Sequence, residues 1–191
     1  MDNGIPCPKT ALFSDISGFC DDGWNYPLVI KPRSGYGANG FNKVENREEL
    51  ERLFALTEKK FGASLVQEYI PQSSSQYQVE MVMGRDGGCK CFVLMDKLRW
   101  YPINGSSSTI NVTVKEKKIK SDCIALMKKI GWVGYASLDL IRDPRDGVAK
   151  ILEINPRING TAKICFRCGV DLALLLLEEA EGGEMTEFPD Y

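Results

Sequence analysis

The amino-acid sequence predicts an α+β fold with mainly antiparallel sheets. Pairs of β-prone segments are joined by short polar turns, RDGG at 85–88 and DPRDG at 143–147, whose composition is typical of β-hairpins. Two further segments, at 47–61 and 117–130, carry apolar residues at helical spacing. At 191 residues, the chain is long enough to bury a working core and to divide into two lobes.

The expected strands are short apolar or alternating segments that end at glycine, proline or polar turns. Before them lies a lead-in of 26 residues with little periodicity, which we expect to be irregular with one helical turn near Ser14. In chain order, the predicted strands are Tyr26–Lys31, Phe41–Val44, Ser64–Ile70, Tyr77–Met83, Cys89–Met95, Ile110–Val114, Gly134–Arg142 and Val148–Asn155.

The expected helices depend on apolar spacing and on end signals. Asn46 and Glu49 form a capping box, which predicts a helix that begins at about Arg47. Gly62 and Gly131 each follow a helical segment and should end it. The predicted helices are Arg47–Phe61, Lys117–Ile130, Thr161–Arg167 and a segment that begins at Leu172.

Charge and hydropathy exclude several partners. A formal net charge of -2 provides no basic field for nucleic acid. No apolar run approaches the roughly 18 residues that span a bilayer, so we expect no membrane association. The N-terminal MDNGIPCPKT lacks the charged and apolar regions of a signal peptide, so we expect a cytoplasmic location.

Histidine is absent, which excludes triads with an imidazole base and H-E-x-x-H zinc sites within this chain. The seven cysteines are scattered among apolar residues. Cys165 and Cys168 form a C-x-x-C, but a zinc site needs a second pair or histidines, so we expect reduced and mostly buried thiols. Carboxylates, lysine, arginine, backbone amides and a metal remain as the means of catalysis.

The segment IKPRSGYGANGF places Gly35, Gly37 and Gly40 directly behind the apolar run YPLVIK. A dinucleotide site requires a helix to open on such glycines, whereas FNKV, which follows here, has strand-like composition. The context of strand, loop and strand fits a flap whose amides cover nucleotide phosphates, with Lys31 adding a charge. Protein kinases use such a flap, but their histidine-arginine-aspartate and aspartate-phenylalanine-glycine motifs are missing. A flexible surface loop stays open as the alternative.

The segment YASLDLIRDPRDGVAKILEINPR predicts a hairpin that brings two carboxylates together. If the turn centres on Asp146, Asp139 opposes Glu153 and Ser137 opposes Asn155, and alternation places these four residues on one face. A slip by one residue would bury the carboxylates and expose the apolar residues, so the pattern itself favours this register. The other face would then present a core surface formed by Leu138, Leu140, Leu152 and Ile154.

Like charges that oppose each other in a sheet are destabilising, and a bound cation would remove the conflict. The carboxylates of Asp139 and Glu153, with the amide carbonyl of Asn155, are hard oxygen ligands that suit Mg²⁺ or Mn²⁺, which keep waters and take further ligands from phosphates. The polar face continues through Arg157 into a loop, 156–160, suited to a substrate. A solvated face whose side chains splay apart is the alternative.

With a lysine strand, a glycine flap, a hinge strand and a metal hairpin in that order, the chain resembles the ATP-grasp superfamily, above all its carbamoyl-phosphate-synthetase-like and biotin-carboxylase-like members. The resemblance covers nearly the whole chain, and its most specific segments are PLVIKPRSGYGANGF, VQEYI and SLDLI…ILEINPR. It implies an ATP-grasp fold in which two α+β lobes, 1–70 with the flap and 71–191 with the metal hairpin, clasp ATP. Such enzymes phosphorylate a carboxylate to an acylphosphate, which an amine, thiol or other nucleophile attacks.

The resemblance also implies roles for residues on the nucleotide side. Lys31 would contact the phosphates and the base, and the glycine loop would close over them. Gln76 falls roughly where relatives place an acidic ribose ligand, and Glu80 is the alternative if it does not simply face solvent. The adenine would lie on a hinge formed by Glu68, Tyr69 and Ile70.

On the metal side, Asp139 and Glu153 would bridge magnesium to the phosphates, with Asn155 as a further ligand. Arg157 would stabilise charge on the transferring phosphoryl group, as expected in phosphoryl transfer. Arg99 would bind phosphate or the acceptor carboxylate, although an exposed strand arginine without a role is an equal alternative.

Relatives carry a domain before this region, and we expect it to be missing here, so that either the chain is a fragment or a separate subunit supplies the rest. The leading hypothesis is the ATP-binding part of an ADP-forming, magnesium-dependent carboxylate ligase that acts on small-molecule carboxylate and amine substrates. The alternatives are a non-catalytic nucleotide sensor and an interaction domain without a nucleotide. The sequence does not identify the acceptor.

Overall fold

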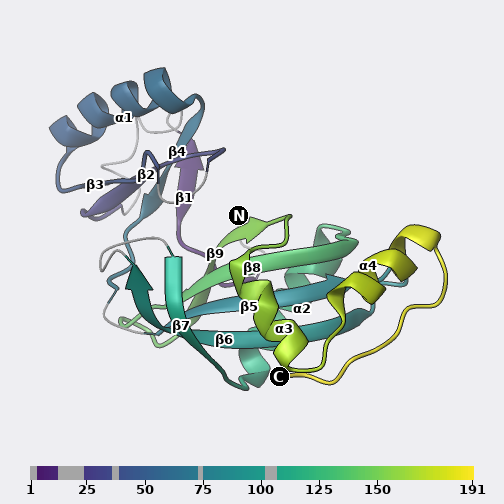
Figure 1. Ribbon diagram of the computed structural model, residues 1–191. Helices are drawn as coiled ribbons and strands as arrows, with labels where there is room; N and C mark the ends of the chain where they lie inside the picture. Colours follow the sequence, from purple (N-terminus) through teal and green to yellow (C-terminus); the bar gives the residue numbers. More distant parts are fainter. Residues whose placement is uncertain (1–3, 13–23, 36–38, 73–74, 102–106) are drawn as a thin grey trace. The chain divides into compact units, whose positions relative to one another are not determined.

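The computed structural model describes residues 4–12, 24–35, 39–72, 75–101 and 107–191, and its fold is α+β with antiparallel sheets, as predicted (Figure 1). Contacts divide the chain into two compact units, each with its own sheet. One unit comprises Pro8–Pro71 with Trp100–Ser107, and the other comprises Met1–Cys7, Gln72–Arg99 and Ser108–Tyr191.

The first unit is a four-stranded sheet in the order β1-β4-β2-β3, in which each strand pairs antiparallel with its neighbour. Helix α1 packs on this sheet through Leu50 and Phe54, which share a core with Ile30 and Val66. Its elements are β1 (Thr10–Leu12), β2 (Leu28–Pro32), β3 (Asn42–Val44), α1 (Arg47–Phe61) and β4 (Ser64–Glu68).

Helix α1 has the predicted bounds because its end signals are local. The Asn46 side chain accepts a hydrogen bond from Glu49 N, while the Glu49 carboxylate accepts one from the backbone of Glu45, one residue before the cap. Gly62 ends the helix at φ 84°, with its N–H donating to the Glu58 carbonyl.

The second unit is a five-stranded sheet in the order β7-β6-β5-β8-β9. Strand β5 pairs antiparallel with β6 on one side and with β8 on the other, and β9 pairs antiparallel with β8. The strands are β5 (Gln76–Met83), β6 (Cys89–Tyr101), β7 (Ser107–Thr113), β8 (Gly134–Arg142) and β9 (Ala149–Asn155).

The two faces of this sheet are covered differently (Figure 1). On one face, α2 (Lys117–Lys129) buries Cys123 and Met127 against Leu138 and its neighbours, and each large side chain so buried contributes about 1.5–3 kcal/mol. The C-terminal elements cover the end of the other face that carries Val82 and Tyr135. These elements are η2 (Gly160–Ala162), α3 (Lys163–Arg167) and α4 (Leu172–Glu181). The remainder of that face bears the polar side chains of the predicted hairpin.

The structure differs from the predicted strands at three places in particular. Strand β1 lies in the predicted irregular lead-in, since three residues paired with β4 are too few to show a period. Strand β4 ends at Glu68 rather than Ile70. Strand β6 runs on to Tyr101, and the prediction ended it at Met95 because the second half of the strand lacks apolar alternation. The helical turn expected near Ser14 falls outside the described residues. Among those that are described, no helix combines the length and apolar character that a bilayer crossing requires.

Candidate functional site

Strands β8 and β9 bring the two predicted carboxylates face to face. Asp139 opposes Glu153 and Ser137 opposes Asn155, which confirms the predicted register. The Asn155 Nδ2 donates to Asp139 Oδ2 and to Glu153 Oε1, both at 3.2 Å, so the amide lies between the carboxylates. We refer to Asp139, Glu153 and Asn155 as the carboxylate hairpin.

The register is interrupted directly beside the carboxylates. A bulge follows Asp139, so Leu140 opposes Ile151 instead of Leu152, and Leu152 is left as the extra residue. Ile151 joins the core at 6% exposure, which makes the prediction of Leu152 as a core residue wrong. The extra residue shifts the alternation of β9 by one position. Ile151 can therefore face the core while Glu153 lies on the polar face opposite Asp139. Since both candidates are apolar, the sequence could not distinguish them.

A lysine that the sequence interpretation missed provides the counter-charge of the hairpin. Lys97 on β6 reaches across β5 and donates from Nζ to Asp139 Oδ1, forming an ion pair whose side chains are 11% and 20% exposed. Gln78 on β5 opposes both Asp139 and Met95, and Lys97 lies two residues after Met95, on the same face. The only signal in the sequence was this alternation, which has no meaning until the strand order is known.

The donors of the carboxylate hairpin fit a hard divalent cation that also binds phosphate. Two carboxylates and an amide are typical magnesium ligands, and magnesium takes its remaining ligands from water and phosphate. Within the described ranges, no group of three or more histidine, cysteine or acidic side chains could form a cage from protein ligands alone. To bind a cation through its amide oxygen, Asn155 must turn that oxygen toward the carboxylates, and release of Asp139 by Lys97 would free the second oxygen of this carboxylate as well.

Two predicted arginines belong to the same unit as the hairpin. Arg157 is exposed in the loop that follows β9. Arg99 is exposed on β6, and alternation places it on the face that bears Lys97. Gln76, the predicted ribose ligand, begins β5 opposite Ile141 and is half-buried.

Glu80 does not face solvent, so that interpretation of it is wrong, and both of its carboxylate oxygens are bonded within the protein. Its side chain is 0% exposed; Tyr135 Oη donates to Oε2, and the Thr161 hydroxyl lies 2.7 Å from Oε1. Burial raises the pKa of the Glu80 carboxyl, and the hydrogen bonds oppose this shift only in part. Nothing in the sequence indicates this burial, because Glu80 lies between apolar residues at a position where alternation predicts a solvated side chain.

The predicted phosphate-binding residues belong to the other unit. Lys31 is on β2, where its Nζ lies 3.5 Å from Gln67 Oε1. Gly40 has φ 78°, and a Cβ there would lie 2.6 Å from Pro32 Cγ and 2.8 Å from Phe61 Cδ2, so the position requires glycine. Gly35 has φ 158° and open space around it, and Gly37 lies outside the described residues.

The three predicted hinge residues follow one another at and beyond the end of β4. Glu68 accepts a hydrogen bond from the backbone N of Lys9 at 3.0 Å. The Tyr69 ring carries the Lys43 ammonium at 4.7 Å from its centroid, and Ile70 is buried at 5% exposure. The segment therefore presents an apolar side chain and an aromatic ring beside polar backbone, a composition that suits a flat base.

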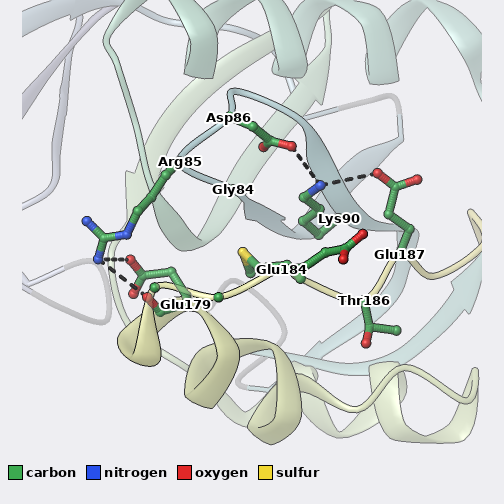
Figure 2. A pocket seen from close by; sticks show the side chains of 11 residues that line it. Gly84, Arg85, Asp86, Lys90, Glu179, Glu184, Thr186 and Glu187 are labelled. Atoms are coloured by element: carbon green, nitrogen blue, oxygen red, sulfur yellow. Dashed lines mark hydrogen bonds and ion pairs between the residues drawn. The ribbon is translucent and has the colours of Figure 1, made fainter.

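A pocket of about 870 Å³ lies elsewhere in the second unit, between the β5–β6 turn and the segment after α4 (Figure 2). Most of its charged side chains are paired with one another: Lys90 Nζ lies 2.9 Å from Asp86 and 3.2 Å from Glu187, and Arg85 lies 2.7 Å from Glu179. None of the predicted site residues lines it. We therefore assign the candidate site to the carboxylate hairpin rather than to this pocket.

Comparisons with known proteins identify the family of the chain. A family model described as an ATP-grasp domain matches residues 1–161. The carbamoyl phosphate synthase large chain of Halomonas eurihalina is 24% identical over 204 residues, which cover 96% of this chain and 18% of that protein. D-aspartate ligase of Enterococcus faecium (strain Aus0004) is 25% identical over 193 residues, covering 92% of this chain and 46% of the ligase.

Among solved structures, the biotin carboxylase domain of 2-oxoglutarate carboxylase from Hydrogenobacter thermophilus, in complex with MgADP, ADP and bicarbonate, matches with a TM-score of 0.76 at 20% identity. The match covers 98% of this chain and 44% of that one. The chain thus spans less than half the length of these relatives. The chain belongs to the ATP-grasp family; its sequence is distantly similar to carbamoyl phosphate synthase large chains, and it shares the fold of biotin carboxylase domains.

Proposed function

We propose that this chain is the ATP-binding part of an ADP-forming, magnesium-dependent carboxylate ligase that acts through an acylphosphate. The observation that supports this most is the opposition of Asp139 and Glu153 on an open polar face, with Lys97 as a displaceable counter-ion. Two facing carboxylates are costly in a sheet, and their geometry suits a cation shared with phosphates. ATP-grasp domains bind ATP with Mg²⁺.

In this proposal, Asp139, Glu153 and Asn155 hold the magnesium, which neutralises charge on the phosphates when bound. Lys97 is then released from Asp139, and its ammonium is free to pair with a phosphoryl oxygen or with the acceptor carboxylate. Arg157 stabilises negative charge that develops during transfer.

The remaining predicted contacts belong to nucleotide binding and to the acceptor. Lys31 and the glycine loop bind the phosphates, Gln76 contacts the ribose, and the adenine lies on the hinge from Glu68 to Ile70. Arg99 binds phosphate or the acceptor carboxylate. A further domain or subunit contributes the rest of the site for the small-molecule carboxylate and amine substrates.

Thermal unfolding with ADP or a non-hydrolysable ATP analogue, with and without magnesium, tests this proposal. A ligand at about a hundred times its dissociation constant adds roughly 2.7 kcal/mol to the free energy of unfolding. We expect a magnesium-dependent stabilisation of the wild-type chain that is lost in Asp139→Asn. Stabilisation that persists in this variant would refute the assigned metal ligands, and release of ADP on addition of acceptor carboxylates would distinguish a ligase from a nucleotide sensor.

A further inference from the structure

A network of buried polar side chains lies next to the carboxylate hairpin, and none of the roles proposed above uses it. Glu80 and Ser137 are both 0% exposed. Glu80 is bonded to Tyr135 and to Thr161, while the Ser137 hydroxyl accepts from Asn159 Nδ2 at 2.7 Å. Because every buried polar group costs free energy unless it is bonded, a network of this extent points to a constraint on the segment it holds.

That segment is the loop 156–160, which carries Arg157. At its start, β9 ends with Asn155 paired to Ser137. At its end, the Asn159 side chain caps the following turn, since Oδ1 accepts from Thr161 N at 2.9 Å and Ala162 N at 3.2 Å. Both ends are therefore fixed to the sheet, whereas Arg157 between them is exposed.

A count of hydrogens shows how tightly the end of the loop is tied. The Thr161 hydroxyl lies 2.7 Å from Glu80 Oε1 and 2.5 Å from Asn159 Oδ1, but it has one hydrogen to donate. Both contacts are satisfied if the Glu80 carboxyl carries a proton and donates to Thr161, which in turn donates to Asn159. Burial, which raises the pKa of Glu80, favours that protonated form. A series of hydrogen bonds then links β5 to β8 through the loop, and it runs from Glu80 through Thr161 and Asn159 to Ser137.

We propose that this Glu80–Thr161–Asn159 network is a positioning device that holds the loop 156–160 so that Arg157 meets the terminal phosphate of the bound nucleotide. The inference rests on the proposed function, and Glu80 and Thr161 are positioning residues that touch no substrate. Loss of the network should therefore lower the affinity for a nucleotide with the terminal phosphate more than the affinity for one without it.

Calorimetric titration of the whole chain with MgADP and with the magnesium complex of a non-hydrolysable ATP analogue provides the test. Thr161→Val keeps the shape of the side chain and removes the hydroxyl. We expect this variant to bind the analogue about tenfold more weakly, while its affinity for ADP changes less than about twofold. The reason is that one lost charge-assisted contact is worth about 1.4 kcal/mol or more. Arg157→Ala should lower the affinity for the analogue by a similar factor. The double variant should lose no more affinity than either single variant.

Matched variants separate positioning from general damage. Thr161→Ser retains the hydroxyl and should bind the analogue as the wild type does, and Glu80→Gln should do so because an amide can donate to Thr161 as a protonated carboxyl does. Tyr135→Phe removes the other hydrogen bond to Glu80 and should leave the ratio of the two affinities unchanged. If Thr161→Val does not fold, Asn159→Ser shortens the same tether from the loop side and is measured in its place.

Each outcome decides the proposal. Equal losses for ADP and the analogue, or losses that add in the double variant, would overturn the positioning role and leave the proposed function standing. Absence of nucleotide binding by the wild-type chain would overturn the proposed function itself, and the positioning role with it.

Discussion

Replacement of Lys97 by methionine should lower the stability of the protein, and added magnesium should restore part of the lost stability. The ion pair with Asp139 is largely buried, with side chains 11% and 20% exposed. Two unit charges about 4 Å apart attract by about 4 kcal/mol at an effective dielectric constant of about 20, and desolvation offsets much of this. The net worth of a hydrogen bond to a charged group is about 1.5–3 kcal/mol, so we expect a loss of that size.

For a chain of this length, each kcal/mol corresponds to about 2–4 °C in the midpoint of thermal unfolding, so Lys97→Met should unfold about 3–12 °C below the wild type. Its Asp139 and Glu153 then oppose each other without a cation. Added MgCl₂ should recover at least half of the lost stability, and NaCl at equal ionic strength should not.

Lys118→Met is the matched control, because Lys118 is 74% exposed and pairs with Asp122 one helical turn away. Pairs of this kind contribute about 0.3–0.5 kcal/mol, so the control should unfold within about 2 °C of the wild type and show no recovery with magnesium. If Lys97→Met has the same unfolding midpoint as the Lys118→Met control, or if magnesium stabilises both variants equally, Lys97 is not the counter-ion of a metal site.

Three further predictions follow from local geometry. Gly40→Ala should lower the free energy of unfolding more than Gly87→Ala does in urea titrations: both positions have positive φ and each costs about 1–2 kcal/mol, but only at Gly40 would a Cβ meet neighbouring atoms closer than 3 Å. The hydrogen bond from Arg145 holds the pKa of Asp143 well below its usual 3.8, so Asp143→Asn should lower the free energy of unfolding at neutral pH. The difference between wild type and variant should stay constant above about pH 5 and become smaller as the pH falls below 3.8. A difference that grows in acid would contradict this. Alkylation of the native protein, read by peptide mass spectrometry, should modify exposed Cys7 well before Cys91, because burial raises the pKa of Cys91 to about 12.

The cysteines illustrate how far composition alone could go. Reduced, mostly buried thiols were expected, and among the described residues Cys91, Cys123 and Cys165 are buried free cysteines. Cys7, in contrast, is exposed, and Cys168 is half-buried. Burial follows the position of each residue on a strand or helix face, which composition does not contain.

Features that depend on neighbours in the chain could be predicted from the sequence by itself. The bounds of α1 follow from Asn46, Glu49 and Gly62, all within one turn of its ends. The opposition of Asp139 and Glu153 follows from a single turn and from period-two alternation, since a slip by one residue would expose a leucine face. The order of these motifs along the chain was enough to identify the ATP-grasp family.

Features that depend on the order of strands in space were decided by the tertiary structure. Lys97 meets Asp139 because β5 lies between β6 and β8, and Glu80 is buried because the C-terminal helices cover its end of the sheet. The bulge at Leu152 was equally invisible, since two adjacent apolar residues satisfy either register. Local sequence fixes which way a side chain points from its own strand, whereas its counter-charge and its burial come from segments tens of residues away, whose approach is governed by the packing of the whole core.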